Sequence, residues 1–385
     1  MKLFLNGYLL VLLYFNTLRI AGIPLKLDFL MSILVVTLLF LSTKNVKKEE
    51  IIFLLLWLPF LLYQLLVIVF NMLFGFKDIF FLFIPVYILF SFYTLNHLFK
   101  SYRRLLIKHL KIFLFINFIA VMFQYFDVLS TNQIFENLYK SLSISVSGAD
   151  SLHYKYLMMR PIGIIGNPIK LAFIIFIVGE SIFRVEKKFY VKVITYLIIL
   201  VSGARMVLIA SLLYEVTKFF HSRYITKSQL IFISVSPFIL VIASLVAYEY
   251  IEFFQYTIDK IINGEIGSTH SFSHRFMKYT DLFNLDFPKL LFGGYSIYYF
   301  KQYVDSEIVM RIYQFGIIGL TLWYLPFVWL IIKNKFTLNA LAVIVFLFLN
   351  TITSFVFTNL LYIPFVLLFI ITTQYKNNEN SLYSF

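Results

Sequence analysis

Stretches of about 20 apolar residues recur along this chain between short polar segments, and they constrain its fold more than any other feature. A helix needs that length to cross the hydrocarbon of a bilayer. Of the 385 residues, 61% are hydrophobic and 14% are charged, whereas soluble domains carry roughly 25% charged residues. A soluble fold of this length has too little interior to hide so much apolar surface. The sequence therefore predicts an all-α integral membrane protein.

We expect about twelve transmembrane helices in one polytopic membrane domain that covers 1–385. The first stretch lacks a small-residue cleavage site, so we expect it to be retained as a span. Two short stretches flank Ser202-Gly203-Ala204-Arg205, and they are either two full spans joined at a membrane surface or one broken pair. The expected spans are 3–21, 27–43, 51–72, 78–96, 110–129, 162–182, 189–203, 206–220, 229–248, 306–332, 338–356 and 359–375.

Lysine and arginine gather in alternate loops between these stretches, which the positive-inside rule assigns to the cytoplasm together with both termini. The opposite, external side then receives two longer segments, 130–161 and 249–305, and the second lies between spans 9 and 10. Long loops of this kind often carry function. The basic loop residues are Lys44, Lys47, Lys48, Lys100, Arg103, Arg104, Lys108, Lys111, Arg184, Lys187, Lys188, Lys218, Arg223, Lys227, Lys333 and Lys335.

The formal net charge of +14 does not indicate nucleic-acid binding, because no nucleic-acid-binding motif accompanies it and the basic residues lie in short loops. The chain has no cysteine, which excludes disulfides and Cys-ligated metals. His270 and His274 have the spacing of a metal pair on a helix, but no partner ligands stand nearby, so we interpret them as solvated loop residues. We expect neither a metal nor a cofactor.

Four arginines stand on the predicted external side, where the positive-inside rule disfavours them. Placing an arginine near hydrocarbon costs free energy, so such an arginine usually faces a cavity or a partner. A guanidinium group can bind two phosphate oxygens at once. The set therefore indicates an anionic ligand such as a lipid-linked diphosphate. The alternative for each is snorkelling to the interface or pairing with a loop carboxylate. The four are Arg160, Arg205, Arg275 and Arg311.

Four segments combine arginine and glycine: RPIGIIGNPIKLA (160–172), LIILVSGARMVLIA (197–210), SHRFMKYTDLFNLDFPKLLFGGYS (273–296) and DSEIVMRIYQFGIIGL (305–320). In this order they resemble elements of the bacterial O-antigen polymerase and ligase family. Ligases of the family carry His-Asn where Asp305-Ser306 stands here, and this departure favours a polymerase over a ligase.

The resemblance implies transfer of a growing glycan from undecaprenyl diphosphate onto another lipid-linked repeat unit, at the external face of the bacterial plasma membrane. It implies that Arg160, Arg205 and Arg275 bind diphosphate or glycan, with Arg311 as a fourth. Asp305 occupies the ligase histidine position and is the expected general base, with Glu307 as the alternative. Either acid could instead pair with Arg311 or cap the helix that starts near 306.

The implied partners are undecaprenyl-diphosphate-linked oligosaccharides, membrane lipids, and a chain-length regulator and flippase of the same pathway. Two alternatives from other classes of protein are a flippase for lipid-linked oligosaccharides and a structural membrane subunit. A flippase usually has a two-lobed repeat, which we do not find, and a structural subunit leaves the external arginines unexplained. Within the family, the ligase activity is the alternative.

The remaining motif residues have backbone roles. Asn167 fits a helix cap and Pro168 fits a first turn, so they are expected to open a span. The expected turn residues are Gly203, Gly293 and Gly294, since glycine tolerates conformations closed to other residues. The resemblance implies that Gly163 also lies in a turn, which follows Arg160. Gly316, with Gly319, is expected to allow close helix packing.

Overall fold

In the computed structural model the described residues are 1–15, 19–20, 23–24, 27–42, 48–71, 81–134, 161–165, 167–219, 259, 279, 281–295, 306–333, 337–352, 354, 356–357 and 359–374. Within them, the regular structure is helical apart from one antiparallel pair of two-residue strands, β1 (Arg19–Ile20) and β2 (Ile23–Pro24). The helices are α1 (Lys2–Leu10), the π-helical η1 (Val11–Phe15), α2 (Leu27–Ser42), α3 (Lys48–Leu55), α4 (Leu58–Phe70), the 3₁₀ turns η2 (Phe81–Phe83) and η3 (Val128–Ser130), α6 (Ile84–Ser101), α7 (Arg103–Tyr125), α10 (Pro168–Glu186), α11 (Phe189–Val201), α12 (Arg205–Phe219), α16 (Phe287–Phe292), α17 (Glu307–Ile332), α18 (Leu338–Thr351) and α19 (Ile363–Thr373).

Helices overlap each expected span except 229–248, which lies outside the described residues, but their ends differ from the expected ones. α7 begins at Arg103, before the expected span 110–129, the break between α3 and α4 divides the expected span 51–72, and β1 lies inside the expected span 3–21. Among the described residues, three helical stretches are long and apolar enough to cross a membrane by length and composition: Lys48–Phe70, Arg103–Tyr125 and Glu307–Ile332. Other described helices of 10–17 residues are also apolar. This length and composition are those of a helical membrane protein. Most of the predicted loops 130–161 and 249–305 also lies outside the described residues.

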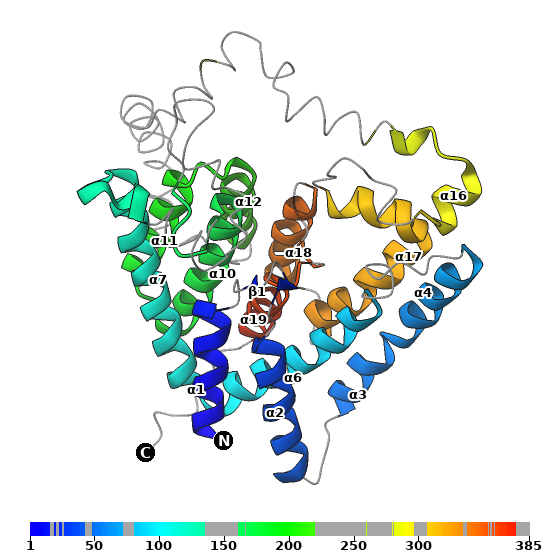
Figure 1. Ribbon diagram of the computed structural model, residues 1–385, viewed down its shortest axis with the longest axis horizontal. Coiled ribbons are helices and arrows are strands. Elements are labelled where there is room, and N and C mark those ends of the chain that lie inside the picture. Colours follow the sequence, from blue (N-terminus) through cyan, green and yellow to red (C-terminus); the bar gives the residue numbers. More distant parts are fainter. Residues whose placement is uncertain are drawn as a thin grey trace.

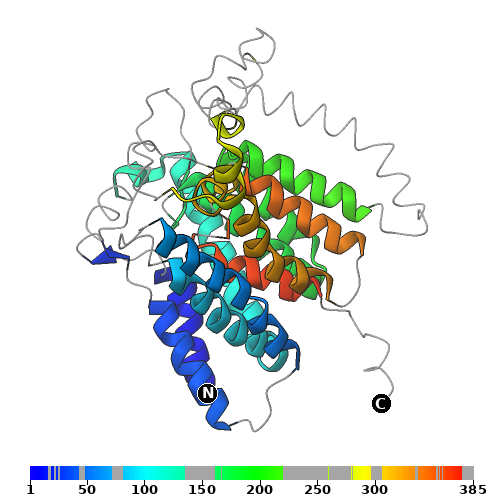
Figure 2. The same cartoon turned by 90° about the vertical axis from the view of Figure 1, so that its right-hand side faces the viewer.

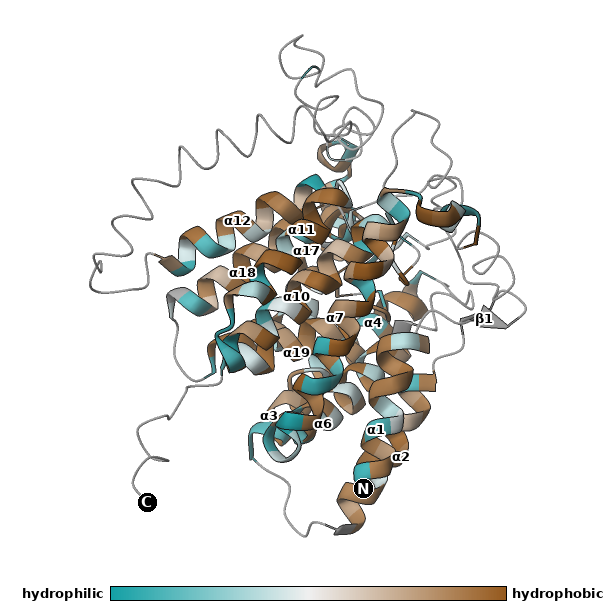
Figure 3. Ribbon diagram, turned by 90° about the vertical axis from the view of Figure 1, so that its left-hand side faces the viewer, coloured by the Kyte–Doolittle hydropathy of each residue, from teal (hydrophilic) through white to brown (hydrophobic). Residues whose placement is uncertain are grey.

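Most of the helix ribbon in Figure 3 is brown, and many of the large apolar side chains on these helices are exposed. On α4, for example, Leu62, Leu65 and Leu66 are each about half exposed. Such a surface is suited to lipid, since a soluble monomer rarely exposes wide apolar patches. The interior is aromatic: the rings of Trp57 and Trp323 meet edge to face with centroids 5.3 Å apart.

One end of the bundle gathers the segments that the sequence analysis singled out. The 161–165 turn precedes α10, the 202–204 turn joins α11 to α12, and Ser306 at the start of α17 meets the last turn of α18, with its hydroxyl 3.5 Å from the Thr351 carbonyl. We call this the motif end. It is the upper end of the helices in Figure 1, and Figure 2 shows it from the side.

A buried charge cluster ties α10 to α12 towards the opposite end. The carboxylate of Glu180 is enclosed, and its Oε1 accepts hydrogen bonds from Arg184 Nε at 3.1 Å and from the Tyr214 hydroxyl at 2.8 Å. Lys218 forms an ion pair with the same oxygen, and Arg184 also donates to the Tyr214 hydroxyl. A buried carboxylate is tolerated only with such partners, so this cluster fixes how the two helices sit.

Glu180→Ala is expected to lower the free energy of unfolding by about 3–5 kcal/mol, because Arg184 and Lys218 lose the charge that compensates their desolvation. Thermal and denaturant unfolding in detergent would measure it. The matched control is Glu49→Ala, since Glu49 is more than half exposed where it pairs with Lys333. That surface change is expected to cost about 1 kcal/mol or less. Equal losses in the two variants would contradict a structural role for the cluster.

Candidate functional site

Helix α17 is broken at Gly316, where φ is +65° and ψ is −175°. This conformation is essentially restricted to glycine. Figure 1 shows that the first half of α17 runs sideways beside α16, and the second half turns down into the bundle. The expectation that Gly316 serves only close packing of one continuous span was therefore incomplete. The residue does meet another segment closely, but it also ends one helical segment and starts the next.

The break frees backbone carbonyls, and other segments satisfy them. The Tyr313 carbonyl accepts from the Tyr295 N–H at 3.2 Å, and the Gln314 carbonyl accepts from the Gly294 N–H at 3.0 Å. The Phe315 carbonyl accepts from the Tyr63 hydroxyl of α4 at 2.9 Å. Broken helices in membrane proteins persist only where such partners exist, since lipid offers none. The segment after α16 and helix α4 thus hold α17 in its bent form.

Glycine is required on both sides of this contact. A Cβ on Gly316 would lie 2.0 Å from the Leu291 carbonyl oxygen, and a Cβ on Gly293 would lie 2.4 Å from the Phe315 nitrogen. Gly293 and Gly294 also have positive φ values, +74° and +113°, as expected for turn residues. Glycines of two separate motif segments therefore form one backbone-to-backbone contact.

The first turn of α17 is capped by Ser306, whose hydroxyl accepts from the Val309 N–H at 3.4 Å. The cap is therefore Ser306, and the alternative in which Glu307 caps this helix was wrong. Glu307 is instead fully enclosed, and its Oε2 accepts from the Phe357 N–H at 2.8 Å. This bond joins the start of α17 to the segment between α18 and α19. Asp305 itself lies outside the described residues.

Arg311 is fully buried one helical turn after Glu307, and the two charges interact. Its guanidinium lies 4.2 Å from the ring centroid of Trp323, which belongs to the other half of the broken helix. Nη1 also donates to the Gln314 side chain at 3.4 Å. A desolvated cation on a tryptophan face is worth about 2 kcal/mol, so this contact strengthens the bend. The structure places Arg311 inside the protein.

Tyr279 is a contributor that the sequence analysis missed. Its hydroxyl lies 2.7 Å from the Ser306 hydroxyl and donates to the Ile352 carbonyl at 3.2 Å. It thereby connects the segment 273–296 to the start of α17 and the end of α18. No local pattern marks this tyrosine, because its partners are 27 and 73 residues away.

The segment 161–165 is a buried turn held by two carboxamides of α7. Gln124 Oε1 accepts from the N–H groups of Ile162 and Gly163, both at 2.9 Å, and Asn117 Oδ1 accepts from the Ile164 N–H at 3.2 Å. Gly163 has a φ of +55°, and a Cβ there would lie 2.7 Å from the Asn117 side chain. Gly163 thus lies in a turn, as the resemblance implies, and the Gln124 and Asn117 side chains of α7 support that turn.

Asn167 and Pro168 open α10 as predicted. Asn167 Oδ1 accepts from the N–H groups of Ile169 and Lys170, both at 3.0 Å, and Pro168 occupies the first helical turn. The helix therefore starts directly after the buried turn, which fixes the direction in which the chain leaves the motif end.

Arg205 is the first residue of α12 and its side chain is exposed. It follows a turn in which Gly203 has a φ of +64°, again as expected for a turn residue. The structure shows α11 and α12 as two separate helices joined by this turn. Because a helix N-terminus carries partial positive charge, Arg205 extends a region that already favours anions.

The structure thus brings Glu307, Arg311, Gly293, Gly294 and Gly316 into one assembly around α17. Gly163, Asn167 and Pro168 form a second assembly, and Gly203 with Arg205 forms a third, all in segments at or beside the motif end. Arg160, Arg275 and Asp305 lie outside the described residues. Among the described residues, no group of three or more metal-ligating side chains occurs.

The fold and these assemblies are those of a helical membrane protein in which the described glycines with positive φ lie in the motif segments. No protein-family model, no curated protein and no solved structure matches this chain.

Gly316→Ala is expected to lower the free energy of unfolding by about 3 kcal/mol or more, since the new Cβ strains the backbone and collides with a carbonyl. The matched control is Gly7→Ala in α1, where the Cβ would meet only the flexible end of Met31. There the gain in helix propensity, about 1 kcal/mol, offsets the contact. Unfolding in detergent measures both variants. A Gly316→Ala protein as stable as Gly7→Ala would show that α17 does not need its break.

Proposed function

We propose that the protein is a polysaccharide repeat-unit polymerase of the bacterial plasma membrane. It transfers a growing glycan from undecaprenyl diphosphate onto another lipid-linked repeat unit, in O-antigen, capsule or exopolysaccharide synthesis. The observation that carries the proposal is the ordered set of four segments that resemble the O-antigen polymerase and ligase family. The geometry supports it, because the described parts of these segments supply the irregular turns and helix starts at and beside the motif end.

In this proposal about twelve helices cross the membrane and the motif end is external. The alternating basic loops support this orientation by the positive-inside rule. The substrates reach the site within the membrane plane, since both donor and acceptor are anchored to it by their lipids. A chain-length regulator and a flippase are the expected partners.

The proposed reaction forms one bond and breaks another at the anomeric carbon of the donor glycan. A hydroxyl of the acceptor sugar attacks that carbon, and the bond from the carbon to the diphosphate oxygen breaks. The leaving lipid diphosphate keeps the electron pair, and a general base takes the proton of the acceptor hydroxyl. Positive groups lower the barrier by stabilising the charge that develops on the diphosphate.

Arg205 is the described residue best suited to the diphosphate. It is exposed, and it stands at the N-terminus of a 15-residue helix, where the helix dipole adds to its charge. Arginine can also bind two phosphate oxygens at once. By the resemblance, Arg160 and Arg275 complete the set.

The two buried charges of α17 suit a supporting role better than direct contact. Arg311 is enclosed against Trp323, and the Glu307 carboxylate is engaged by a backbone N–H. In the proposed mechanism they hold the first half of α17 in place. Asp305, which directly precedes the Ser306 cap, then remains the proposed base.

Arg205→Ala is expected to slow glycan polymerisation by about 100-fold or more, the usual cost of losing a group that stabilises developing charge. The assay reconstitutes the full chain with synthetic undecaprenyl-diphosphate repeat units and follows the ladder of longer lipid-linked glycans. The control is Arg223→Ala, because the sequence assigns Arg223 to a cytoplasmic loop, and it is expected to leave the ladder unchanged. Membrane abundance of each variant separates lost activity from lost protein.

Failure of the folded wild-type protein to make a ladder would refute the polymerase proposal. Movement of labelled lipid-linked oligosaccharide across the vesicle bilayer would favour the flippase instead. Transfer of finished glycan to a lipid A core would favour the ligase. A normal ladder from Arg205→Ala would refute the role given to that arginine.

A further inference from the structure

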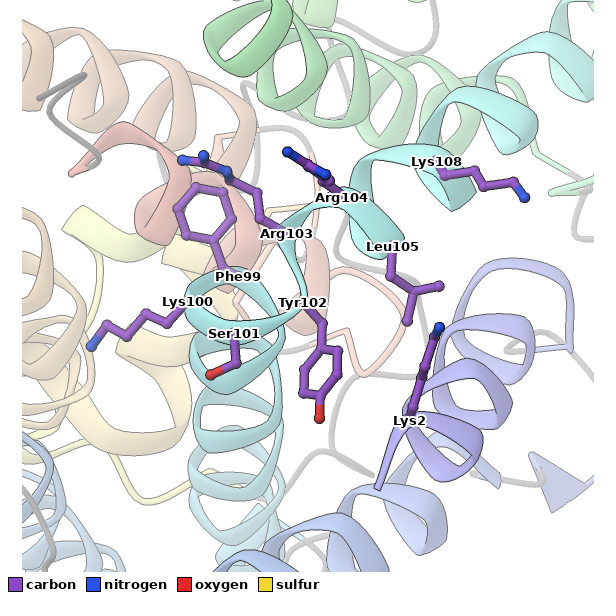
Figure 4. A pocket seen from close by; sticks show the side chains of 9 residues that line it. All are labelled: Lys2, Phe99, Lys100, Ser101, Tyr102, Arg103, Arg104, Leu105 and Lys108. Atoms are coloured by element: carbon purple, nitrogen blue, oxygen red, sulfur yellow. The ribbon is translucent and has the colours of Figure 1, made fainter. Parts of the chain in front are cut away.

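A cationic pocket of about 820 Å³ lies between the start of α1 and the corner where α6 passes into α7. Of the nine described residues that line it, five are basic and none is acidic. Figure 4 shows that they come from two parts of the chain, with Lys2 on α1 and the others around the α6–α7 corner. We call this the corner pocket. Its basic residues are Lys2, Lys100, Arg103, Arg104 and Lys108.

The fold holds these like charges together. Only Tyr102 separates the end of α6 from the start of α7, so the basic run is confined to a tight corner. Lys2 is brought to the corner because α1 packs on α7, where Asn6 Oδ1 lies 3.1 Å from His109 Nε2. Four of the five basic residues fall in the nine-residue run 100–108, and all five line the same pocket. Such an arrangement favours an anionic occupant.

The first turn of α7 adds to this preference. Its cap residue, Tyr102, makes no side-chain cap hydrogen bond to the N–H groups of that turn. Helix N-termini bind phosphate and carboxylate through these groups and through the positive end of the helix dipole. Here the N-terminus belongs to a 23-residue helix and opens at the same place as the basic side chains.

The outer face of α7 continues from the pocket as an apolar stripe. Arg104 and Lys108 begin a series with helical spacing of three or four residues, so its members share one face of the helix. The next members are between 40% and 55% exposed, and they are Ile112, Phe115, Ile119 and Phe123. This face of α7 therefore has basic side chains at its start and a row of exposed apolar side chains beyond them. A molecule with an anionic head and acyl chains fits both parts, whereas a free anion uses only the first.

We propose that the corner pocket binds the anionic headgroup of a glycerophospholipid from the cytoplasmic leaflet, with its acyl chains along the α7 stripe. The corner lies at the opposite end of α7 from Gln124, which supports the motif end. The positive-inside rule assigns this corner to the cytoplasm, where the membrane surface is rich in anionic lipid. Basic pockets between transmembrane helices on that side bind lipid headgroups. Lipid binding at this pocket does not require the proposed polymerase activity.

The positive-inside rule needs only basic residues in a loop, and it does not need a cavity. Lys187 and Lys188, at the end of α10, provide the comparison within this chain. Both are exposed, and neither lines the corner pocket. They belong to another basic loop that the positive-inside rule assigns to the same side of the membrane.

The test is lipid titration of the purified full-length protein in detergent, followed by native mass spectrometry and thermal stability. The probes are short-chain phosphatidylglycerol, short-chain phosphatidylcholine and inorganic phosphate at equal ionic strength. The wild type is expected to bind phosphatidylglycerol in preference to the other two. Arg104→Gln/Lys108→Gln is expected to weaken that binding about tenfold or more, since each basic residue contributes to attraction of anionic lipid. Both side chains are exposed, so the fold is expected to be unaffected.

The charge-matched control, Lys187→Gln/Lys188→Gln, is expected to bind phosphatidylglycerol like the wild type. Equal losses in the two double variants would overturn the proposal, because they would show a general effect of net charge. Equal binding of phosphatidylcholine and phosphatidylglycerol by the wild type would also overturn it. Binding of inorganic phosphate as strong as that of phosphatidylglycerol would overturn the assignment to a lipid.

Discussion

Every backbone polar group inside a membrane protein needs a hydrogen-bond partner from the protein itself. The break in α17 can exist only because other segments supply such partners. Gly316 turns the helix, and three successive carbonyls are then satisfied by Tyr295, Gly294 and Tyr63. These bonds connect α4, the turn after α16 and both halves of α17. These bonds hold the first half of α17 in its sideways course. In that position the side chains of Glu307 and Arg311 are enclosed.

The same constraint shapes the second motif region. The 161–165 turn is buried among helices, and Gln124 and Asn117 of α7 supply the acceptors that its N–H groups need. In both regions a glycine has a positive φ, and a segment distant in sequence supplies hydrogen-bond partners to the backbone at or beside that glycine. Irregular backbone of this kind is where membrane proteins commonly place binding groups. The apolar helices serve as the frame that holds these turns at defined positions.

Much of the fold follows from local patterns in the sequence. Long apolar runs predicted the approximate helix positions. Asn167 before Pro168 predicted the start of α10, and glycines of the motif segments predicted turns. The break at Gly316 could not be inferred, because glycine is common in continuous transmembrane helices. Nor could the burial of Arg311 be inferred, because the ring of Trp323 meets it only once the helix has bent. The support of the 161–165 turn depends on side chains 38 to 47 residues away, and sequence spacing does not report such contacts.

Accessibility labelling can determine whether the motif end is external and the corner pocket cytoplasmic, as we propose. The chain has no cysteine, so single cysteines report without background. Leu129→Cys and Ser101→Cys place exposed reporters at opposite ends of α7. With a membrane-impermeant maleimide on intact cells whose outer layers are permeable to it, we expect labelling of the first, and labelling of the second only after the plasma membrane is opened. The reverse pattern, or equal labelling of both in intact cells, would contradict this orientation.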